Sequence, residues 1–164
     1  ILEFSPTIIS LLLAGKLGSN IASSIGTMRV TQQIDALEVM GINPIIYLVR
    51  PKIFALIFFN PILITVSMFV GVIGGLFAGI LSNECTATEY INGLQYDFIP
   101  FKALYALIKT VLFAFIIASV SSFFGFFTKS GALEVGKSST KAVVYSSVVI
   151  IVSNYILTQL LLGS

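Results

Sequence analysis

Residues 131–138 have the Gly-x-x-x-x-Gly-Lys-Ser spacing of a phosphate-binding loop, whose backbone amides and lysine hold nucleotide phosphates. Such a loop must follow a buried strand, precede a helix and work with an aspartate that binds Mg²⁺. Here a long apolar segment precedes the motif, and neither Asp35 nor Asp97 ends an apolar strand. We therefore expect no nucleotide to bind to this chain and attribute the pattern to chance.

Other catalytic chemistry finds little support in the composition. The chain has no histidine and one cysteine, which excludes a His/Cys zinc site, a disulfide framework and a histidine-based triad. Its net charge is +2 without a long basic run, so nucleic acid is not an expected partner. We predict that the chain is not an enzyme and that it holds no catalytic residue, metal or cofactor of its own.

The composition is that of a membrane protein. Of the 164 residues, 57% are apolar and only 10% are charged, and the mean hydropathy is +1.04. Soluble domains carry about 25% charged residues, so this chain has too few charges to cover a water-exposed surface of its size. The leading class is therefore an integral membrane protein.

Charged residues divide the chain into segments, because each charge is costly in hydrocarbon and about 20 helical residues span a bilayer. We predict an all-α, polytopic membrane helix bundle of about four spans. A span end and a small-residue helix occupy residues 1–26, and further spans occupy 51–82, 103–128 and 142–162. The chain begins abruptly at Ile1, and we expect the start of its first span to be missing.

The connections between spans predict the orientation. The segments 27–52 and 129–141 contain Lys and Arg, whereas 83–100 contains only acidic charges. The positive-inside rule places the first two in the cytoplasm and the third outside. Lys102 and Lys109, near the outer side, weaken this assignment without reversing it.

Residues 27–43 predict a short amphipathic helix in the first connection. Val30, Ile34 and Leu37 share one helical face, while Gly41 suits a left-handed C-terminal position and Pro44 blocks continuation. Ile42 would fold back on Leu37. The helix could lie on lipid headgroups or dock into a cytoplasmic partner. Its nearly neutral polar face favours docking, because helices that lie on membranes are usually rich in Lys and Arg.

Small residues recur at every fourth position in two segments, which lets another backbone approach closely. We interpret Gly71, Gly75 and Gly79 as a helix-packing face, with a sliding interface of a transporter as the alternative. The second stripe has the same spacing and consists of Ala14, Gly18, Ala22 and Gly26.

A few polar residues lie at or near membrane depth, where such residues usually face a bundle interior or a cavity. We expect Pro61 to kink its helix and Asn60 to cap the hydrogen bond that Pro61 frees. Lys109 either extends outward to the interface or pairs with a lipid phosphate. Asn154 is expected to form a hydrogen bond between helices rather than to bind substrate.

The segment from Gly26 to Pro44 resembles the signature of the MlaE family, the permease subunits of bacterial ABC-type phospholipid transporters linked to MCE proteins. Residues 3–6, 13–16, 131–144 and 158–163 resemble other family segments in order and spacing. The similarity covers nearly the whole chain. Three residues depart from frequent family residues, namely Leu2, Gln33 and Asn154.

The resemblance implies that the amphipathic helix is a coupling helix seated on a separate ABC ATPase subunit, which carries ATP and Mg²⁺. The docking residues would be Arg29, Gln32, Gln33, Asp35, Leu37 and Glu38. It further implies a second permease copy, a central phospholipid cavity near Glu3 and Leu2, and a periplasmic lipid-binding protein with an MCE domain. Such a complex would sit in the bacterial inner membrane, move phospholipids between the inner and outer membranes, and maintain outer-membrane lipid asymmetry. Family members also have an N-terminal stretch that is missing here.

A secondary transporter or channel subunit that works without an ATPase is the alternative function. It would require a charged site at the membrane midplane, such as paired carboxylates or broken helices that hold ions. Apart from Glu3, the sequence offers no carboxylate at membrane depth, which argues against coupling to protons or cations.

Overall fold

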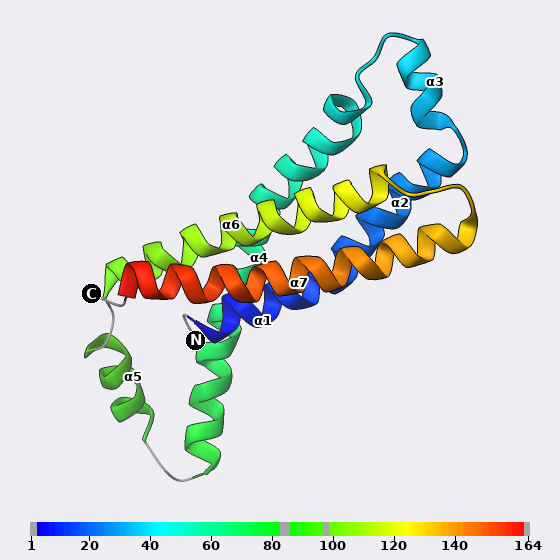
Figure 1. The fold of residues 1–164 in the computed structure, drawn as a ribbon. Helices are drawn as coiled ribbons and strands as arrows, with labels where there is room; N and C mark the ends of the chain where they lie inside the picture. The colour runs from blue at the N-terminus through cyan, green and yellow to red at the C-terminus, as the bar shows by residue number, and fades with distance from the viewer. Residues whose placement is uncertain (1–2, 83–85, 97–98, 163–164) are drawn as a thin grey trace.

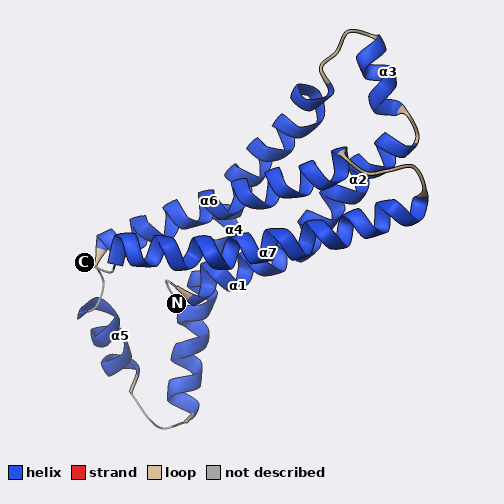
Figure 2. Cartoon of the chain, viewed as in Figure 1, coloured by secondary structure: helices blue, strands red, loops and turns tan. Residues whose placement is uncertain are grey.

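The structure is a computed structural model that describes residues 3–82, 86–96 and 99–162, and every element in these ranges is helical. Four helical stretches are long and apolar enough to cross a membrane: Phe4–Val30, Ile45–Leu81, Pro100–Phe126 and Ala132–Leu160. The all-α class and the four membrane spans are thus confirmed (Figure 2).

The first span is continuous and consists of α1 (Phe4–Leu13), a π-helical segment (Ala14–Gly18) and α2 (Ser19–Val30). A short helix, α3 (Gln33–Val39), follows. The second span consists of a π-helical segment (Ile45–Val49) and α4 (Arg50–Leu81). After α5 (Ala87–Tyr96), the last two spans are α6 (Pro100–Phe126) and α7 (Ala132–Leu162).

Helix α6 lies at the centre of the bundle and contacts α2, α4 and α7 (Figure 1). Its buried side chains, including Phe113 and Ile117, form a core with Ala14, Leu56 and Ile150. Helices α2 and α6 approach closely at Gly125, where a Cβ atom would lie 2.8 Å from the carbonyl oxygen of Ala22.

All four residues of the N-terminal small-residue stripe are buried in the bundle. A Cβ atom at Gly18 would lie 2.9 Å from Ser121 Oγ, and one at Gly26 would lie 2.9 Å from Thr128 Oγ1. Ala14 and Ala22 are fully buried. The stripe therefore packs the first span tightly against α6.

The glycine stripe of α4 has a different environment. A Cβ atom at Gly71 would meet nothing within 4 Å, and one at Gly75 would meet the hydroxyl of Tyr90 in α5 at 2.7 Å. Gly79 is half-buried. The reason is that the second half of α4 extends away from the other spans (Figure 1). Within the described chain, the side chain that lies against this stripe comes from the short helix α5.

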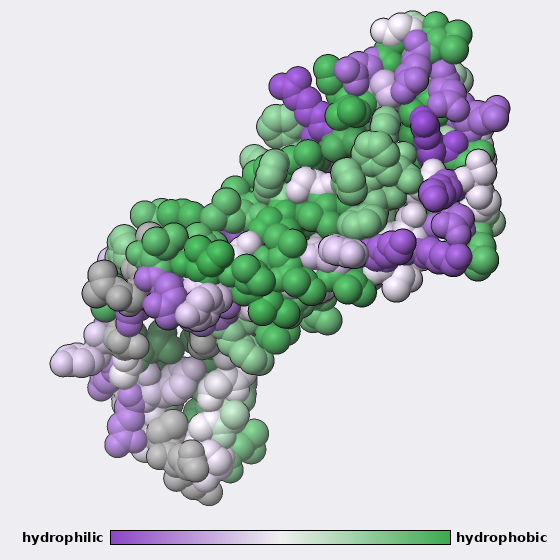
Figure 3. All heavy atoms as spheres, in the orientation of Figure 1, coloured by the Kyte–Doolittle hydropathy of each residue, from purple (hydrophilic) through white to green (hydrophobic). Residues whose placement is uncertain are grey.

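The bundle separates two polar ends. Figure 1 places α3 and the turn between α6 and α7 at one end, and α5, the start of α1 and the end of α7 at the other. Figure 3 shows an apolar belt between these ends, with hydrophilic residues gathered beyond it. The three connections therefore alternate between the two ends, as the spacing of charges predicts.

Asn60 corrects one sequence-based expectation. Its Nδ2 donates to the carbonyl oxygen of Thr110 at 2.8 Å, so it links α4 to α6 instead of capping the hydrogen bond freed by Pro61. Asn60 is fully buried on the face of α4 that packs against α6, and this packing directs its amide to the neighbouring helix. Pro61 lies inside α4, which continues as a single helix to Leu81.

The last span also begins earlier than its first uncharged residue. Helix α7 starts at Ala132, so residues 132–141 are helical rather than a loop. Gly131 has a positive φ of 119°, which lets the chain turn sharply after α6. The amides of Glu134 and Val135 donate to the carbonyl of Gly131 and begin the helix there.

Candidate functional site

Helix α3 is the candidate functional site and lies after the end of α2, at the same end of the bundle as the turn between α6 and α7 (Figure 1). The sequence predicts one continuous helix within residues 27–43, but the structure ends α2 at Val30 and starts α3 at Gln33. Gln32 adopts the left-handed conformation with φ of 58°, which reorients the chain between the two helices. A non-glycine residue in this region is uncommon, so the break marks a position that the surrounding packing determines.

The inner face of α3 is anchored to the bundle. Ile34 is fully buried and packs with Ile25 and Leu48, and Leu37 lies against the same cluster. These contacts join α3 to α2 and to the start of the second span. One face of the helix is therefore packed against the bundle, and most of its other residues are exposed.

The C-terminus of α3 is closed by a Schellman motif. The amide of Ile42 donates to the carbonyl of Leu37 at 3.0 Å, and the amide of Gly41 donates to that of Glu38 at 3.0 Å. Gly41 has φ of 76°, a conformation that glycine adopts without steric cost. The predicted left-handed cap at Gly41 is confirmed, and it keeps this short helix from unravelling.

An ion pair closes the turn between α2 and α3. Arg29 Nη1 lies 2.8 Å from Asp35 Oδ1, and the guanidinium sits 5.6 Å from the ring centre of Phe126 in α6. In one continuous helix Arg29 and Asp35, which are six residues apart, would point in different directions. The break at Gln32 brings them together, because α3 folds back towards the end of α2.

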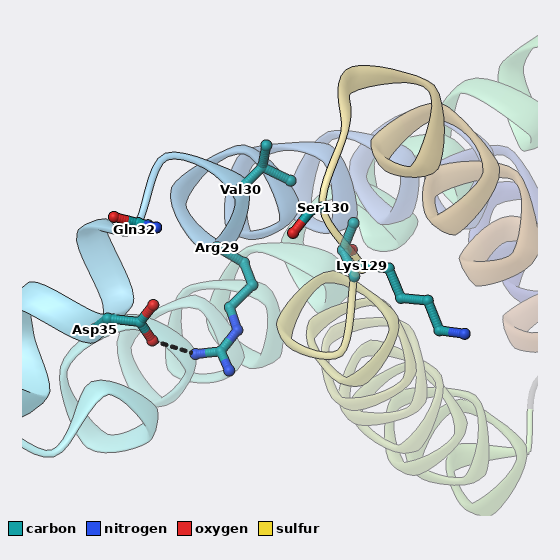
Figure 4. A pocket seen from close by; sticks show the side chains of 7 residues that line it. Arg29, Val30, Gln32, Asp35, Lys129 and Ser130 are labelled. Atoms are coloured by element: carbon teal, nitrogen blue, oxygen red, sulfur yellow. Dashed lines mark hydrogen bonds and ion pairs between the residues drawn. The ribbon is translucent and has the colours of Figure 1, made fainter.

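A polar pocket of about 360 Å³ lies beside this ion pair. Figure 4 shows that its walls come from the end of α2, the start of α3 and the turn between α6 and α7. Lys129 and Ser130 line it from that turn, and the Lys129 side chain points away from Asp35. The pocket joins the first and last connections of this end into one surface.

The outer side of α3 exposes both polar and apolar groups. Gln32, Gln33, Asp35 and Glu38 are exposed, whereas Arg29 and Leu37 are partly buried. Val39 and Met40, which the sequence reasoning did not single out, are 90% and 65% exposed. The sequence could have predicted their exposure, because they lie outside the helical face formed by Ile34 and Leu37 and directly precede Gly41. Solvent-exposed apolar residues beside carboxylates suit a protein interface.

A second polar cluster lies near the opposite end, inside the bundle. Lys109 Nζ donates to Glu3 Oε2 at 2.6 Å and to Thr158 Oγ1 at 3.1 Å, and it lies 4.7 Å from the ring centre of Tyr105. Lys109 is fully buried, so it neither extends to the interface nor faces a lipid phosphate. The sequence-based expectation was wrong because α1 brings the Glu3 carboxylate against α6, and a buried ammonium group requires such a partner.

Asn154 belongs to the same region of the bundle. Its Oδ1 accepts a hydrogen bond from Thr7 Oγ1 at 3.3 Å, so the predicted bond between helices is confirmed. Oε1 of Glu3 is buried and has no hydrogen-bond partner in the described part of the chain. Leu2 lies outside the described residues.

The comparison with known families agrees with this geometry. The sequence model of the permease MlaE matches residues 1–160. The chain belongs to the MlaE permease family. This membership confirms the resemblance carried by residues 26–44, the segment that contains α3.

Several curated relatives of this MlaE-family chain are described as transporter subunits. It is 39% identical over 158 residues to the probable ABC transporter permease protein RP096 of Rickettsia prowazekii, which covers 96% of this chain and 61% of the relative. It is 38% identical to the probable ABC transporter permease protein slr1045 of Synechocystis, and the match covers 97% of this chain and 60% of the relative. It is 33% identical to the chloroplastic protein TRIGALACTOSYLDIACYLGLYCEROL 1 of Arabidopsis thaliana, and the match covers 96% of this chain and 45% of the relative. The chain thus spans about 61% of the length of the first of these relatives.

The phosphate-loop pattern of the MlaE-family chain lies in a helix. Residues 132–138 form the first turns of α7, and α6 rather than a strand precedes them. The amides of Glu134 and Val135 are bonded to Gly131, and Lys137 Nζ lies 2.8 Å from Glu134 Oε1. These donors are engaged within the helix, so the segment has none of the geometry of a nucleotide cradle.

Proposed function

We propose that this chain is the membrane-spanning part of a permease in an ATP-driven ABC transporter, and that α3 is its coupling helix. The carrying observation is that α3 lies at one end of the bundle with most of its residues exposed, while Ile34 and the Gly41 cap hold it firmly. A helix that transmits movement from an ATPase must be held rigidly by its own bundle and must expose a surface to the ATPase. Helix α3 has both properties.

The surface that would contact the ATPase combines the exposed docking residues with the apolar tip. Gln32, Gln33, Asp35 and Glu38 supply polar contacts, and Val39 and Met40 supply an apolar anchor. Arg29 would act indirectly by holding Asp35 in place. ATP and Mg²⁺ would bind to the partner, so this subunit would contribute no catalytic residue.

The substrate we propose is a phospholipid, moved between the inner and outer membranes. The family supports this proposal. So does the name of the Arabidopsis relative, which includes the name of a diacylglycerol glycolipid. The Glu3 carboxylate lies near the end opposite α3, where the lipid cavity would open towards a periplasmic MCE-domain protein.

A second permease copy would complete that cavity. Helices α4 and α7 expose long apolar faces, with Phe58, Phe69, Val148 and Tyr155 all more than half exposed. Such faces must meet lipid or other membrane helices. We propose a homodimer in the bacterial inner membrane with α3 on the cytoplasmic side, as the positive charges near α3 favour.

Co-purification of the full-length permease with its ATPase tests the coupling role. We expect Met40→Asp to reduce the retained ATPase roughly tenfold, because a charge would replace an exposed apolar anchor at the interface centre. Asp35→Lys should have a similar effect. Ile91→Asp is the matched control, since Ile91 is also about half exposed but lies on α5 at the other end. Unchanged retention with both α3 variants would overturn the proposal.

The alternative is a secondary transporter or channel that works without an ATPase. The Lys109–Glu3 pair is a charged site inside the bundle, but it lies near one end and not at the midplane that this alternative requires. The two charges also neutralise each other, so the pair does not call for a coupling ion. Transport by the purified permease alone in liposomes, driven by an ion gradient, would favour the alternative.

A further inference from the structure

A groove of about 380 Å³ runs between α2 and α4, on the α3 side of the bundle. Leu17, Asn20, Ile21 and Ser24 line it from the first span, and Lys52, Ala55, Leu56 and Phe59 line it from the second. These positions follow one face of each helix over about two turns. The groove belongs neither to the α3 docking surface nor to the Glu3–Lys109 cluster.

The end of the groove nearest α3 is polar and cationic. Lys52 Nζ donates to Ser24 Oγ at 3.3 Å, and Asn20, whose side chain is exposed, lies one turn before Ser24 in α2, further from α3. This end offers an ammonium, a hydroxyl and an amide within a short distance. The lining contains a lysine and no carboxylate, so its net charge is positive.

The remainder of the groove is apolar. Leu17 and Ile21 face Leu56 and Phe59 across it, and Phe59 is 62% exposed. Leu56 also belongs to the bundle core, so the floor of the groove is fixed by packing. This apolar lining suits a hydrocarbon chain.

The position of Lys52 along its span matches the depth of a lipid headgroup. The stretch Ile45–Leu81 has 37 residues, about 55 Å of helix, whereas the hydrocarbon core is about 30 Å thick. Because charges are costly in hydrocarbon, the turns that carry Arg50 and Lys52 at the start of this span lie in the headgroup region. Lys52 lies about two turns after Ile45, and Phe59 lies about two turns deeper.

We propose that this groove binds an anionic glycerophospholipid of the leaflet on the α3 side. Its phosphate would contact Lys52, Ser24 and Asn20, and one acyl chain would lie along Leu17, Ile21, Leu56 and Phe59. Basic pockets between membrane helices are known to hold anionic headgroups. The site is separate from the proposed transport cavity, and it requires only that the chain spans a membrane.

A tryptophan placed in the groove can report the bound lipid. In the full-length protein in nanodiscs, we would compare the fluorescence of Phe59→Trp with that of the unsubstituted protein, using brominated phosphatidylglycerol or brominated phosphatidylcholine as quencher. This chain contains no tryptophan of its own. Phe69→Trp is the matched control, because Phe69 is similarly exposed on α4 but lies outside the groove.

We expect phosphatidylglycerol to associate at Phe59→Trp about fivefold more strongly than phosphatidylcholine, the effect of one cation near the headgroup. Lys52→Gln should abolish this preference, and Lys52→Arg should retain it. Lys141→Gln, an exposed lysine on α7, should leave it unchanged. Phe69→Trp should report no preference.

Three results would overturn the proposal. Equal quenching by both lipids at Phe59→Trp would show that no headgroup is selected. Loss of the preference with Lys141→Gln as well as with Lys52→Gln would show only a diffuse charge effect. Absence of quenching by either lipid would show that a protein segment or a second copy covers the groove. Native mass spectrometry of the unsubstituted protein, which should retain phosphatidylglycerol, checks the result without the tryptophan.

Discussion

Two ion pairs, one near each end of the bundle, are built from the same chemistry in different surroundings. Arg29–Asp35 has an N–O distance of 2.8 Å with side chains 35% and 53% exposed, while Lys109–Glu3 has an N–O distance of 2.6 Å with Lys109 1% and Glu3 44% exposed, so the contrast rests on the buried ammonium group. The first pair lies in water, where its attraction is screened, and the second lies among packed helices. Similar distances therefore conceal very different contributions to stability.

The two pairs also differ in what they hold together. The exposed pair fixes the turn between α2 and α3 and leaves the neighbouring side chains of α3 exposed. The buried pair joins the first span to α6, and Thr158 of α7 completes the contact. Loss of the buried pair would disturb the bundle, whereas loss of the exposed pair would disturb only α3.

The largest expected effect comes from Glu3→Ala. This change leaves the buried Lys109 without its carboxylate partner, so we expect the free energy of unfolding to fall by about 3 kcal/mol. This value is at the lower end of the range for broken buried ion pairs, because Glu3 is partly exposed. Unfolding of the full-length protein by dodecyl sulfate in mixed micelles, followed by circular dichroism, measures it. The double variant Glu3→Gln with Lys109→Met should recover most of the loss. A loss below about 1 kcal/mol for Glu3→Ala would contradict the contrast between the two pairs.

A smaller effect is expected from Asp35→Asn. Because the Arg29–Asp35 pair is exposed, its removal should cost about 0.2–1 kcal/mol of stability. A double-mutant cycle with Arg29→Gln isolates the interaction, and raising the salt concentration should weaken it while leaving the Lys109–Glu3 pair nearly unaffected. A coupling energy above about 2 kcal/mol would mean that the two ends are stabilised alike.

The smallest effect concerns α5, a third polar contact that is fully exposed. The Glu89 carboxylate accepts hydrogen bonds from the Thr86 amide at 2.9 Å and the Thr86 hydroxyl at 2.8 Å, and the Glu89 amide donates to Thr86 Oγ1 at 3.4 Å, which completes a capping box. These bonds lower the pKa of Glu89 below its usual value. The cap should therefore stabilise α5 above the unfolded pKa of about 4.5 and be lost as the pH falls through the lower folded pKa.

Hydrogen exchange of the α5 amides across this pH range measures the effect, with rates corrected for intrinsic exchange. Protection should decrease at acidic pH in the unsubstituted protein. Glu89→Gln should remove the pH dependence while leaving the remainder of the bundle unchanged. If protection in α5 stays constant with pH, the cap contributes nothing measurable.

Much of the architecture could be predicted from the sequence because it depends on local properties. Long uncharged stretches must form helices in a membrane, since helices satisfy every backbone hydrogen bond internally. Gly41 before Ile42, followed by Pro44, specifies a helix end through steric preference alone. The four spans and the cap of α3 are accordingly found as predicted.

The break between α2 and α3 could not be predicted in this way. Nothing in Thr31 or Gln32 is typical of a helix end, and a left-handed glutamine is unfavourable by itself. The burial of Ile34 against Ile25 and Leu48, together with the Arg29–Asp35 pair, favours the reoriented helix. Because these contacts join residues of different elements, helical periodicity alone could not reveal them.

The sequence by itself determined which segments cross the membrane, where α3 ends and which family the chain belongs to, because hydrophobicity, charge and glycine conformation act over a few neighbouring residues. Only the tertiary structure decided that Lys109 pairs with Glu3 and that Asn60 bonds to Thr110. These partners are far apart in the chain. A buried polar group finds whichever partner the packed helices bring within reach, and that partner is known only once the helices are in place.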